Sequence, residues 1–261
     1  MKYGFIGCGN MGGAIARALC KSTTSILISA PSEKAAMTAE EIGCNICNNI
    51  EAVQKCEYLF LAVKPQVLES VLTPLSEYLK ESKPIIITMA AGVQISKIEK
   101  WIGIRLPIIR IMPNTPVSVG HGTILYCHNE LVADAILNVF LADMQPCGMF
   151  DKIPENLIDA GSALSGCGPA YVYMFIYALA DGAVACGVPR DKALIYAANT
   201  LLGAAKMVQE TAQHPGQLKD AVCSPGGSTI AGVKVLEEQN FRGAVIDCVH
   251  AAYTRTKELG R

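Results

Sequence analysis

The stretch KYGFIGCGNMG, residues 2–12, decides the fold of this chain. A short apolar run ends in the pattern Gly7-x-Gly9-x-x-Gly12, and a helical pattern follows at once. This order of strand, turn and helix is typical of dinucleotide-binding domains. There the first glycine permits the tight turn, the second lets a pyrophosphate approach, and the third lets the helix pack on the strand. The stretch therefore predicts a nucleotide site at its turn.

Short strand-like runs alternate with helical patterns from this stretch up to residue 153. Near-continuous apolar runs, such as residues 58–62 and 85–87, indicate parallel strands that are covered on both faces. The alternation predicts an α/β fold with a doubly wound sheet of Rossmann type. The expected strands span residues 2–6, 25–29, 44–47, 58–62, 84–88, 107–111, 123–127 and 148–150. The expected helices between them span residues 11–20, 33–42, 65–79, 95–101 and 130–144.

The pattern changes near Ile153, and no strand-like run follows. We therefore expect a Rossmann domain over residues 1–153 and an all-α substrate-binding and dimerisation domain over residues 154–261. Its alanine- and glycine-rich helices suit a dimer interface, although burial within one chain explains them equally well. Residues 160–180 carry no charge, but glycines, serines and a proline interrupt their first half, so we expect a buried core helix rather than a membrane span. The expected helices span residues 154–164, 170–186, 190–210, 215–222, 228–239 and 241–259.

The composition places the chain among globular proteins, with 51% hydrophobic and 17% charged residues among 261. The net charge is −1 and no long basic stripe occurs, so no nucleic-acid partner is expected. Eleven scattered cysteines, and a strand that begins at residue 2 with no room for a targeting segment, predict reduced thiols and a cytoplasmic location. Cys44 and Cys47 form a CxxC pattern without a second pair or a nearby histidine, so neither a metal nor a redox role is expected.

A second glycine turn, SPGGST at residues 224–229, leads directly into an apolar helical pattern. Two glycines let the backbone approach a ligand closely, and the helix start offers free N–H groups and a partial positive charge. Such a turn suits a small carboxylate or phosphate. Taken alone, however, the same residues could merely begin a helix.

The end of the second expected strand bears on the choice of cofactor. NAD-preferring sites usually carry an acidic residue there, which binds the ribose 2′-hydroxyl. This chain instead has Ser29 and Ser32 as small donors and Lys34 as a nearby cation, although Glu33 could repel a phosphate. The sequence favours NADPH and leaves NADH possible.

Together these motifs resemble the pyrroline-5-carboxylate reductase family, and the matches run from Gly4 to Leu259. The second glycine turn inside an all-α domain is the more specific motif, whereas GxGxxG and the AVKP run at residues 62–65 are shared with related reductases. Cys167 stands where the family usually has a serine. His214 precedes a proline. A histidine in this position is more often a loop residue than a proton donor.

The resemblance implies hydride transfer from NAD(P)H to L-1-pyrroline-5-carboxylate, which gives L-proline, in a homodimer or a larger homo-oligomer with no membrane partner. It implies that Ser224, Gly226, Gly227 and Ser228 hold the substrate carboxylate and that Thr229, as the catalytic residue, places its hydroxyl near the ring nitrogen. No metal is expected.

The expected cofactor contacts come partly from the residues themselves and partly from the resemblance. Ala90 and Gly92 leave room for the nicotinamide ring or simply form a tight turn, and Asn114 bonds either the carboxamide or a loop carbonyl. The turn and the second strand add Gly7, Gly9, Asn10, Met11, Gly12, Ser29 and Ser32. The resemblance adds Asn49 beside the adenosine half and Ala62, Val63 and Lys64 along the cofactor.

Three other functions remain open on the sequence. A β-hydroxyacid dehydrogenase would need a catalytic lysine on the first long helix of the second domain, and residues 170–186 contain none. A non-catalytic NADP-sensing protein would need only GxGxxG, so the second glycine turn argues against it. A reductase of another small imine would use the same motifs.

Overall fold

The computed structural model describes residues 1–30 and 32–259, and its contacts divide the chain into two compact units. The first unit holds Met1–Cys167 and the last turns of the C-terminal helix from Ala252 onward, and the second holds Gly168–Ala251. The domain boundary predicted after residue 153 follows the change from strands to helices and stays a prediction. Residues 260–261 of the second predicted domain lie outside the described residues.

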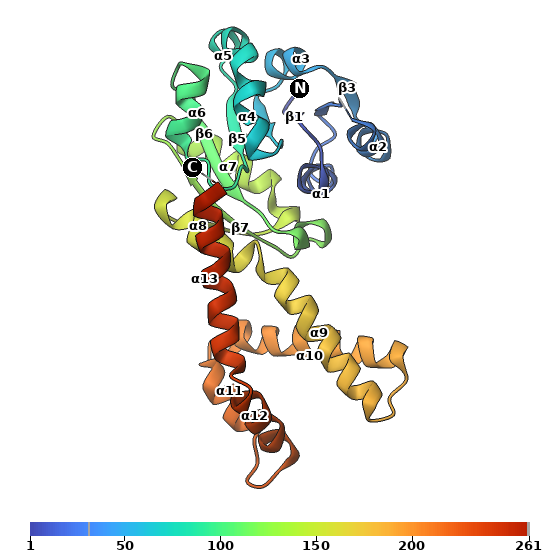
Figure 1. Cartoon of the computed structure of the whole chain (residues 1–261). Coiled ribbons are helices and arrows are strands. Elements are labelled where there is room, and N and C mark those ends of the chain that lie inside the picture. Colours follow the sequence, from blue (N-terminus) through green and yellow to red (C-terminus); the bar gives the residue numbers. More distant parts are fainter. Residues whose placement is uncertain (31, 260–261) are drawn as a thin grey trace. The chain divides into compact units, whose positions relative to one another are not determined.

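The first unit is built on an eight-stranded sheet in the order β3-β2-β1-β4-β5-β6-β7-β8. Figure 1 labels β1, β3, β5, β6 and β7 of this sheet. β1 to β6 are parallel, β7 is antiparallel to β6, and β8 is parallel to β7. This order confirms the doubly wound Rossmann-type sheet. In such a sheet the carboxyl ends of the parallel strands, among them β1, β2, β4, β5 and β6, lie at one edge. The strands are β1 (Tyr3–Ile6), β2 (Ile26–Ser29), β3 (Asn45–Cys47), β4 (Tyr58–Leu61), β5 (Ile85–Thr88), β6 (Ile108–Met112), β7 (Gly122–His128) and β8 (Gly148–Lys152).

The helices of the first unit depart from the expected ones in three places. A short helix after β3 was not predicted, because its seven residues are too few to give a clear apolar period. The helix expected over residues 65–79 is divided by a 3-10 turn at Pro74, which has no N–H to donate. The helix expected from residue 130 begins at Asp134, after a turn closed by the Val132 N–H on the Asn129 carbonyl. The helices are α1 (Asn10–Leu19), α2 (Glu33–Glu41), α3 (Asn49–Lys55), α4 (Pro65–Leu72), α5 (Ser76–Ser82), α6 (Ile95–Ile102), α7 (Asp134–Asp143) and α8 (Glu155–Ser165).

The core of this unit lies on both faces of the sheet. Successive strand side chains point to opposite faces, so Phe5 and Phe60 pack with α1 and α7, whereas Leu59 and Leu61 pack with α4 and α6. The rings of Phe5 and Phe60 are stacked with their centroids 4.4 Å apart. Burial on both faces fixes the register of the strands, and with it the places where their carboxyl ends lie.

The second unit is all-α, as predicted. α9 and α10 pack through small residues, and Ala180, Ala193 and Ala197 form its buried core. Large apolar side chains on the same helices are exposed, among them Met174 at 74% and Tyr173 at 58%. This unit therefore leaves much apolar surface uncovered in a single chain. Its helices are α9 (Gly168–Ala185), α10 (Arg190–Thr211), α11 (Pro215–Ala221), α12 (Ser228–Glu238) and the first part of α13 (Phe241–Leu259).

The apolar segment around α9 is not buried in a single chain, which corrects the expectation of a core helix. Within the described residues, the span Glu155–Ala185 passes a test for membrane-crossing helices on length and composition alone, and its apolar window is 11% buried. Exposed apolar helices of this kind are also typical of surfaces that pack against another copy of the same chain.

Candidate functional site

The turn between β1 and α1 passes very close to the end of β4. Gly7 has a φ of 82°, and a Cβ on it would lie 2.9 Å from the Ala62 carbonyl oxygen. A Cβ on Gly12 would lie 2.9 Å from the Ala62 Cβ. Only glycine therefore fits at both positions, and the start of α1 is held against the end of β4.

The same turn is open on the side where a pyrophosphate would lie. A Cβ on Gly9 would meet no atom within 4 Å, and Gly9 caps α1 without a side-chain hydrogen bond. Within the described residues, the N–H groups of Asn10, Met11 and Gly12 have no hydrogen-bond partner. This glycine cradle with free donors fits the phosphates of a dinucleotide.

Two side chains expected at the adenosine end meet beyond β2. The Ser29 hydroxyl donates to Asn49 Oδ1 at 2.5 Å. Both line a cavity of about 570 Å³, together with Asn48. Asn48 was not predicted as a site residue: it caps α3 by accepting the Glu51 N–H at 2.9 Å. The pair of asparagines directly after a strand was the available signal for it.

A lysine lies beside the cofactor turn. Lys34 Nζ donates to Asn10 Oδ1, so the cation of α2 reaches the first residue of α1. Ser32 caps α2 and its hydroxyl oxygen accepts the Ala35 N–H at 3.4 Å. A cation and a hydroxyl thus stand near the place expected for the ribose 2′-substituent.

Small residues follow β4 and β5 at the same edge of the sheet. A Cβ on Gly7 would lie 2.6 Å from Val63 Cγ1, which places Val63 against the turn. Lys64 stands at the cap position before α4, and its side chain is exposed. After β5, Ala90 is buried and Gly92 has a φ of 72°, which favours glycine.

Asn114 bonds the protein at both ends of its amide. Its Nδ2 donates to the Ser165 carbonyl at 2.9 Å, and its Oδ1 accepts the Thr123 N–H at 3.0 Å. The carbonyl that it bonds belongs to the last residue of α8 rather than to a loop. The amide keeps a second N–H and a second lone pair, and its contact with a cofactor stays a prediction.

The second glycine turn lies in the second unit. Gly226 has a φ of 68°, and a Cβ on Gly227 would lie 2.4 Å from Ser224 Oγ. The Gly227 N–H donates to the Ser224 carbonyl at 3.0 Å and closes the turn. Gly227 then caps α12 without a side-chain hydrogen bond. α12, which has eleven residues, thus begins at a glycine cradle, as α1 does in the first unit.

This second cradle also offers free donors. The N–H groups of Ser228, Thr229 and Ile230 have no partner within the part of the chain that the structure describes. The Ser224 and Thr229 side chains are exposed beside them. Backbone donors and two hydroxyls are therefore available to a small carboxylate.

His214 has a structural partner. It precedes α11, and its Nδ1 accepts the Gly216 N–H at 3.1 Å while its own backbone N–H donates to Gln217 Oε1 at 3.3 Å. This is the geometry of a helix cap, which agrees with a loop role for this residue.

The Cys8 thiol beside the cofactor turn is buried, and the Cys44 and Cys47 thiols are half-buried. Burial raises the pKa of the Cys8 thiol and of the Cys47 thiol to about 11 each. Cys44 and Cys47 pack against different faces of the sheet. Within the described residues no group of three or more metal-ligating side chains occurs. Protonated thiols that point apart are poor nucleophiles and poor metal ligands.

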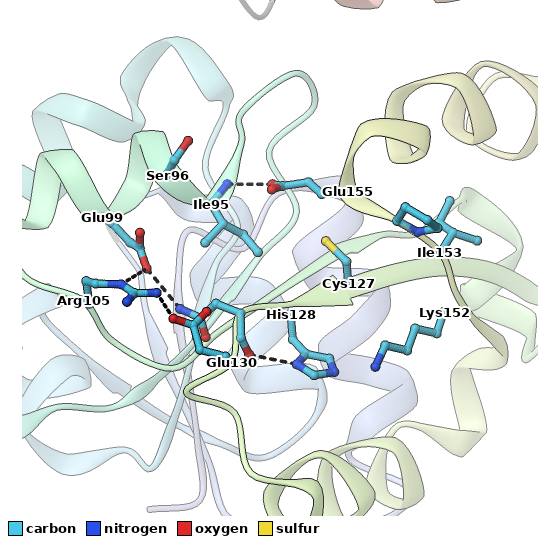
Figure 2. A pocket seen from close by; sticks show the side chains of 12 residues that line it. Ile95, Ser96, Glu99, Arg105, Cys127, His128, Glu130, Lys152, Ile153 and Glu155 are labelled. Carbon is cyan, nitrogen blue, oxygen red and sulfur yellow. Dashed lines mark hydrogen bonds and ion pairs between the residues drawn. The ribbon is translucent and has the colours of Figure 1, made fainter.

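An ionic cluster under α8 was not predicted. Arg110, in β6, is fully buried and pairs with Asp159 at 2.6 Å and with Glu155 at 3.3 Å. Glu155 also accepts the Ile95 N–H, at the start of α6 (Figure 2). The available signal was an arginine inside an otherwise apolar strand, followed by two acids four residues apart at a helix start.

A groove of about 640 Å³ lies between α6 and α8 (Figure 2). It extends from Ile95, at the start of α6, to His128, which pairs with Ile109 near the beginning of β6. None of the residues predicted for cofactor or substrate lines it.

Two family profiles match the chain. The one described as pyrroline-5-carboxylate reductase dimerisation covers residues 155–259, and the one described as NADP oxidoreductase coenzyme F420-dependent covers residues 2–92. The pyrroline-5-carboxylate reductase of Escherichia coli is 40% identical over 270 residues, which is 100% of this chain and 98% of that protein. The Synechocystis enzyme of the same name is 47% identical, over 82% of this chain and 79% of that protein.

Solved structures agree with these sequence matches. A crystal structure of the Plasmodium falciparum pyrroline carboxylate reductase with NADP bound superposes with a TM-score of 0.91 at 34% identity, covering 100% of this chain and 98% of that one. The Streptococcus pyogenes 1-pyrroline-5-carboxylate reductase has the same TM-score at 33% identity, covering 99% and 98%.

The open side of the cofactor turn generates a prediction. Gly9→Ala should leave the melting temperature unchanged, because the new methyl group meets no protein atom, and should raise the Kd for NADPH by about tenfold or more, since the methyl occupies the pyrophosphate cradle. Fluorescence titration and thermal unfolding would measure both. Gly12→Ala is the matched comparison, and it should lower the melting temperature because of its contact with Ala62. Unchanged NADPH affinity in Gly9→Ala would contradict this placement.

Proposed function

The chain belongs to the pyrroline-5-carboxylate reductase family, and from this premise we propose how its residues act in the reduction of L-1-pyrroline-5-carboxylate to L-proline. It is an NAD(P)H-dependent oxidoreductase that acts on the C=N bond of a cyclic imino acid, in the last step of proline biosynthesis. The single observation that carries this function is the 40% identity to a reductase of this name over the whole chain.

The cofactor is proposed to bind along the carboxyl edge of the sheet. The free N–H groups after Gly9 would hold the pyrophosphate, and Ser29 with Asn49 would hold the adenosine half. Ala62, Val63 and Lys64 would lie along the cofactor, and Ala90 and Gly92 would leave room for the ring. When bound, NADPH supplies a hydride from C4 of its nicotinamide ring.

We infer a preference for NADPH over NADH from the surroundings of the second strand. Lys34 and Ser32 supply a cation and a hydroxyl near the expected ribose position, and no carboxylate is bonded to Lys34 within the described residues. A 2′-phosphate would gain a charge-assisted hydrogen bond there, whereas a bare hydroxyl would not.

The substrate carboxylate is proposed to bind at the start of α12. Ser224, Gly226, Gly227 and Ser228 would surround it, with the free Ser228 N–H and the Ser224 hydroxyl as donors, while the Gly227 N–H closes the turn. The partial positive charge of the helix start favours an anion at this position. This turn would fix the carboxylate-bearing side of the substrate ring. The imine carbon, on the other side of the ring nitrogen, would then be held for reduction.

Thr229 is the proposed catalytic residue. Its hydroxyl would hydrogen-bond the ring nitrogen and orient it. A protonated imine already carries its proton, so the site needs no strong general acid, and the helix-capping role of His214 is consistent with that. The protein contributes mainly position and charge stabilisation.

The chain forms a homo-oligomer. A homodimer through the second unit is proposed as its smallest form, because a second copy would cover the exposed apolar side chains of α9 and α10. We also propose a cytoplasmic location, a small-molecule substrate, and no nucleic-acid or membrane partner. The net charge of −1 is close to zero, which favours the absence of a nucleic-acid partner.

The role of Thr229 predicts a specific loss of rate. Thr229→Ala should lower kcat with pyrroline-5-carboxylate by about tenfold or more, which is the scale of one lost positioning hydrogen bond. Thr229→Ser keeps the hydroxyl and should retain most of the activity. Steady-state NADPH oxidation by the purified proteins would measure both. Equal kcat values in Thr229→Ala and the wild type would remove Thr229 from the mechanism.

Lys34 generates a prediction about cofactor choice. Lys34→Met should raise the KM for NADPH by about tenfold and leave the KM for NADH unchanged, because only NADPH carries the 2′-phosphate. Steady-state rates at varied cofactor and saturating substrate would test this. The NADH series is the internal control, and parallel changes for the two cofactors would refute a 2′-phosphate contact.

A further inference from the structure

The loop between β5 and α6 ends at a helix start that lacks its own cap. Residues 89–94 carry Ala90 and Gly92, and α6 begins directly afterwards at Ile95. Gln94 stands at the cap position and makes no side-chain cap hydrogen bond. The first N–H of α6 therefore needs an acceptor from elsewhere in the fold.

Glu155 supplies that acceptor from the start of α8. Its Oε1 accepts the Ile95 N–H at 2.7 Å (Figure 2). Ile95 is buried and the Glu155 side chain is 31% exposed, so this is a charge-assisted hydrogen bond in a partly buried position. The bond ties the end of the loop 89–94 to a different helix.

Arg110 fixes the position of Glu155. Its side chain is fully buried, and its Nη1 lies 3.3 Å from the same Glu155 Oε1. Its Nη2 lies 2.6 Å from Asp159 Oδ1, one turn further along α8. Its Nε has no partner within the described residues, so these two carboxylates alone balance the buried charge. The two ion pairs with this buried side chain hold both carboxylates in place.

α8 itself is also fixed on the sheet. A Cβ on Gly161 would lie 2.4 Å from Leu125 Cδ1, so α8 lies directly on β7. At the far end of α8, Asn114 donates to the Ser165 carbonyl at 2.9 Å. Glu155 is thus a fixed point of the fold rather than a freely moving surface carboxylate.

We propose that Glu155 and Arg110 are positioning residues for hydride transfer. They anchor the end of the loop 89–94 and so hold Ala90 and Gly92 where the nicotinamide ring would lie. The proposal rests on the proposed function, because it assigns a role to that loop. Hydride transfer depends steeply on the placement of donor and acceptor, so a looser loop slows the step.

The test uses the full-length oligomer and two readouts. In the cofactor-free protein, Glu155→Ala should speed amide hydrogen exchange of residues 89–95 by about tenfold, because the acceptor for Ile95 is lost. In a first turnover of enzyme premixed with NADPH, Glu155→Ala should lower the rate constant by about tenfold and leave the amplitude unchanged. Glu155→Gln keeps an oxygen acceptor and should give smaller changes in both, which supplies a milder variant if Glu155→Ala does not fold.

Glu130→Ala is the matched control. Glu130 lines the same groove and pairs with Arg105 at the surface, with its side chain 65% exposed. It should change neither loop exchange nor the first-turnover rate constant. This control separates the loss of the loop anchor from the general loss of a carboxylate in this region.

The inference would be overturned by unchanged exchange of the loop in Glu155→Ala, or by faster exchange with an unchanged rate constant. A lower amplitude at the wild-type rate constant would also contradict it, since that result reports only a smaller folded fraction. If the wild-type protein itself does not turn over pyrroline-5-carboxylate, the proposed function fails instead, and the exchange experiment still decides whether Glu155 anchors the loop.

Discussion

The carboxyl ends of the parallel strands lie at one edge of the sheet. Every proposed cofactor contact depends on this arrangement. Burial on both faces sets the register of β1, β4 and β5, and the register sets where each strand stops. Gly7 and Gly12 then let α1 begin against Ala62 without a clash. The open cradle at Gly9 is a consequence of this packing, because the chain must turn sharply there and leaves its first helical N–H groups unpaired.

The second unit is under a different constraint. Its helices are long, but their buried core consists of three alanines, and large apolar side chains remain exposed. One chain therefore supplies only part of the apolar packing that such helices need. Association with a second copy would complete the packing, which agrees with the family profile for dimerisation over residues 155–259.

The strong periodic signals in the sequence were enough to predict the sheet, the glycine turn and the all-α second half. The cofactor turn could be predicted from Gly7, Gly9 and Gly12, because a turn that brings a strand and a helix together requires glycine at fixed spacings. The existence and the ends of short helices could not be predicted from periodicity. α3 is too short to show a period, and Pro74 could have been used to divide the helix expected over residues 65–79.

The ionic cluster at Arg110 and the exposure of α9 could not be predicted for a different reason. Both depend on which elements far apart in the sequence pack together. Arg110 finds Glu155 and Asp159 only because α8 lies across β7 beside β6. The apolar run at residues 160–180 is equally suited to a core or to an interface, and the pattern alone does not say whether one chain or two will bury it.

The most direct test of the central claim follows a labelled hydride from cofactor to product. NADPH carrying deuterium at both hydrogen positions of C4 of the nicotinamide ring would be mixed with the purified protein and L-1-pyrroline-5-carboxylate, and the product would be examined by mass spectrometry and chiral chromatography. The account predicts L-proline with one deuterium on the ring carbon that was the imine carbon. Absence of proline, or proline without deuterium, would contradict direct hydride transfer between the two ligands.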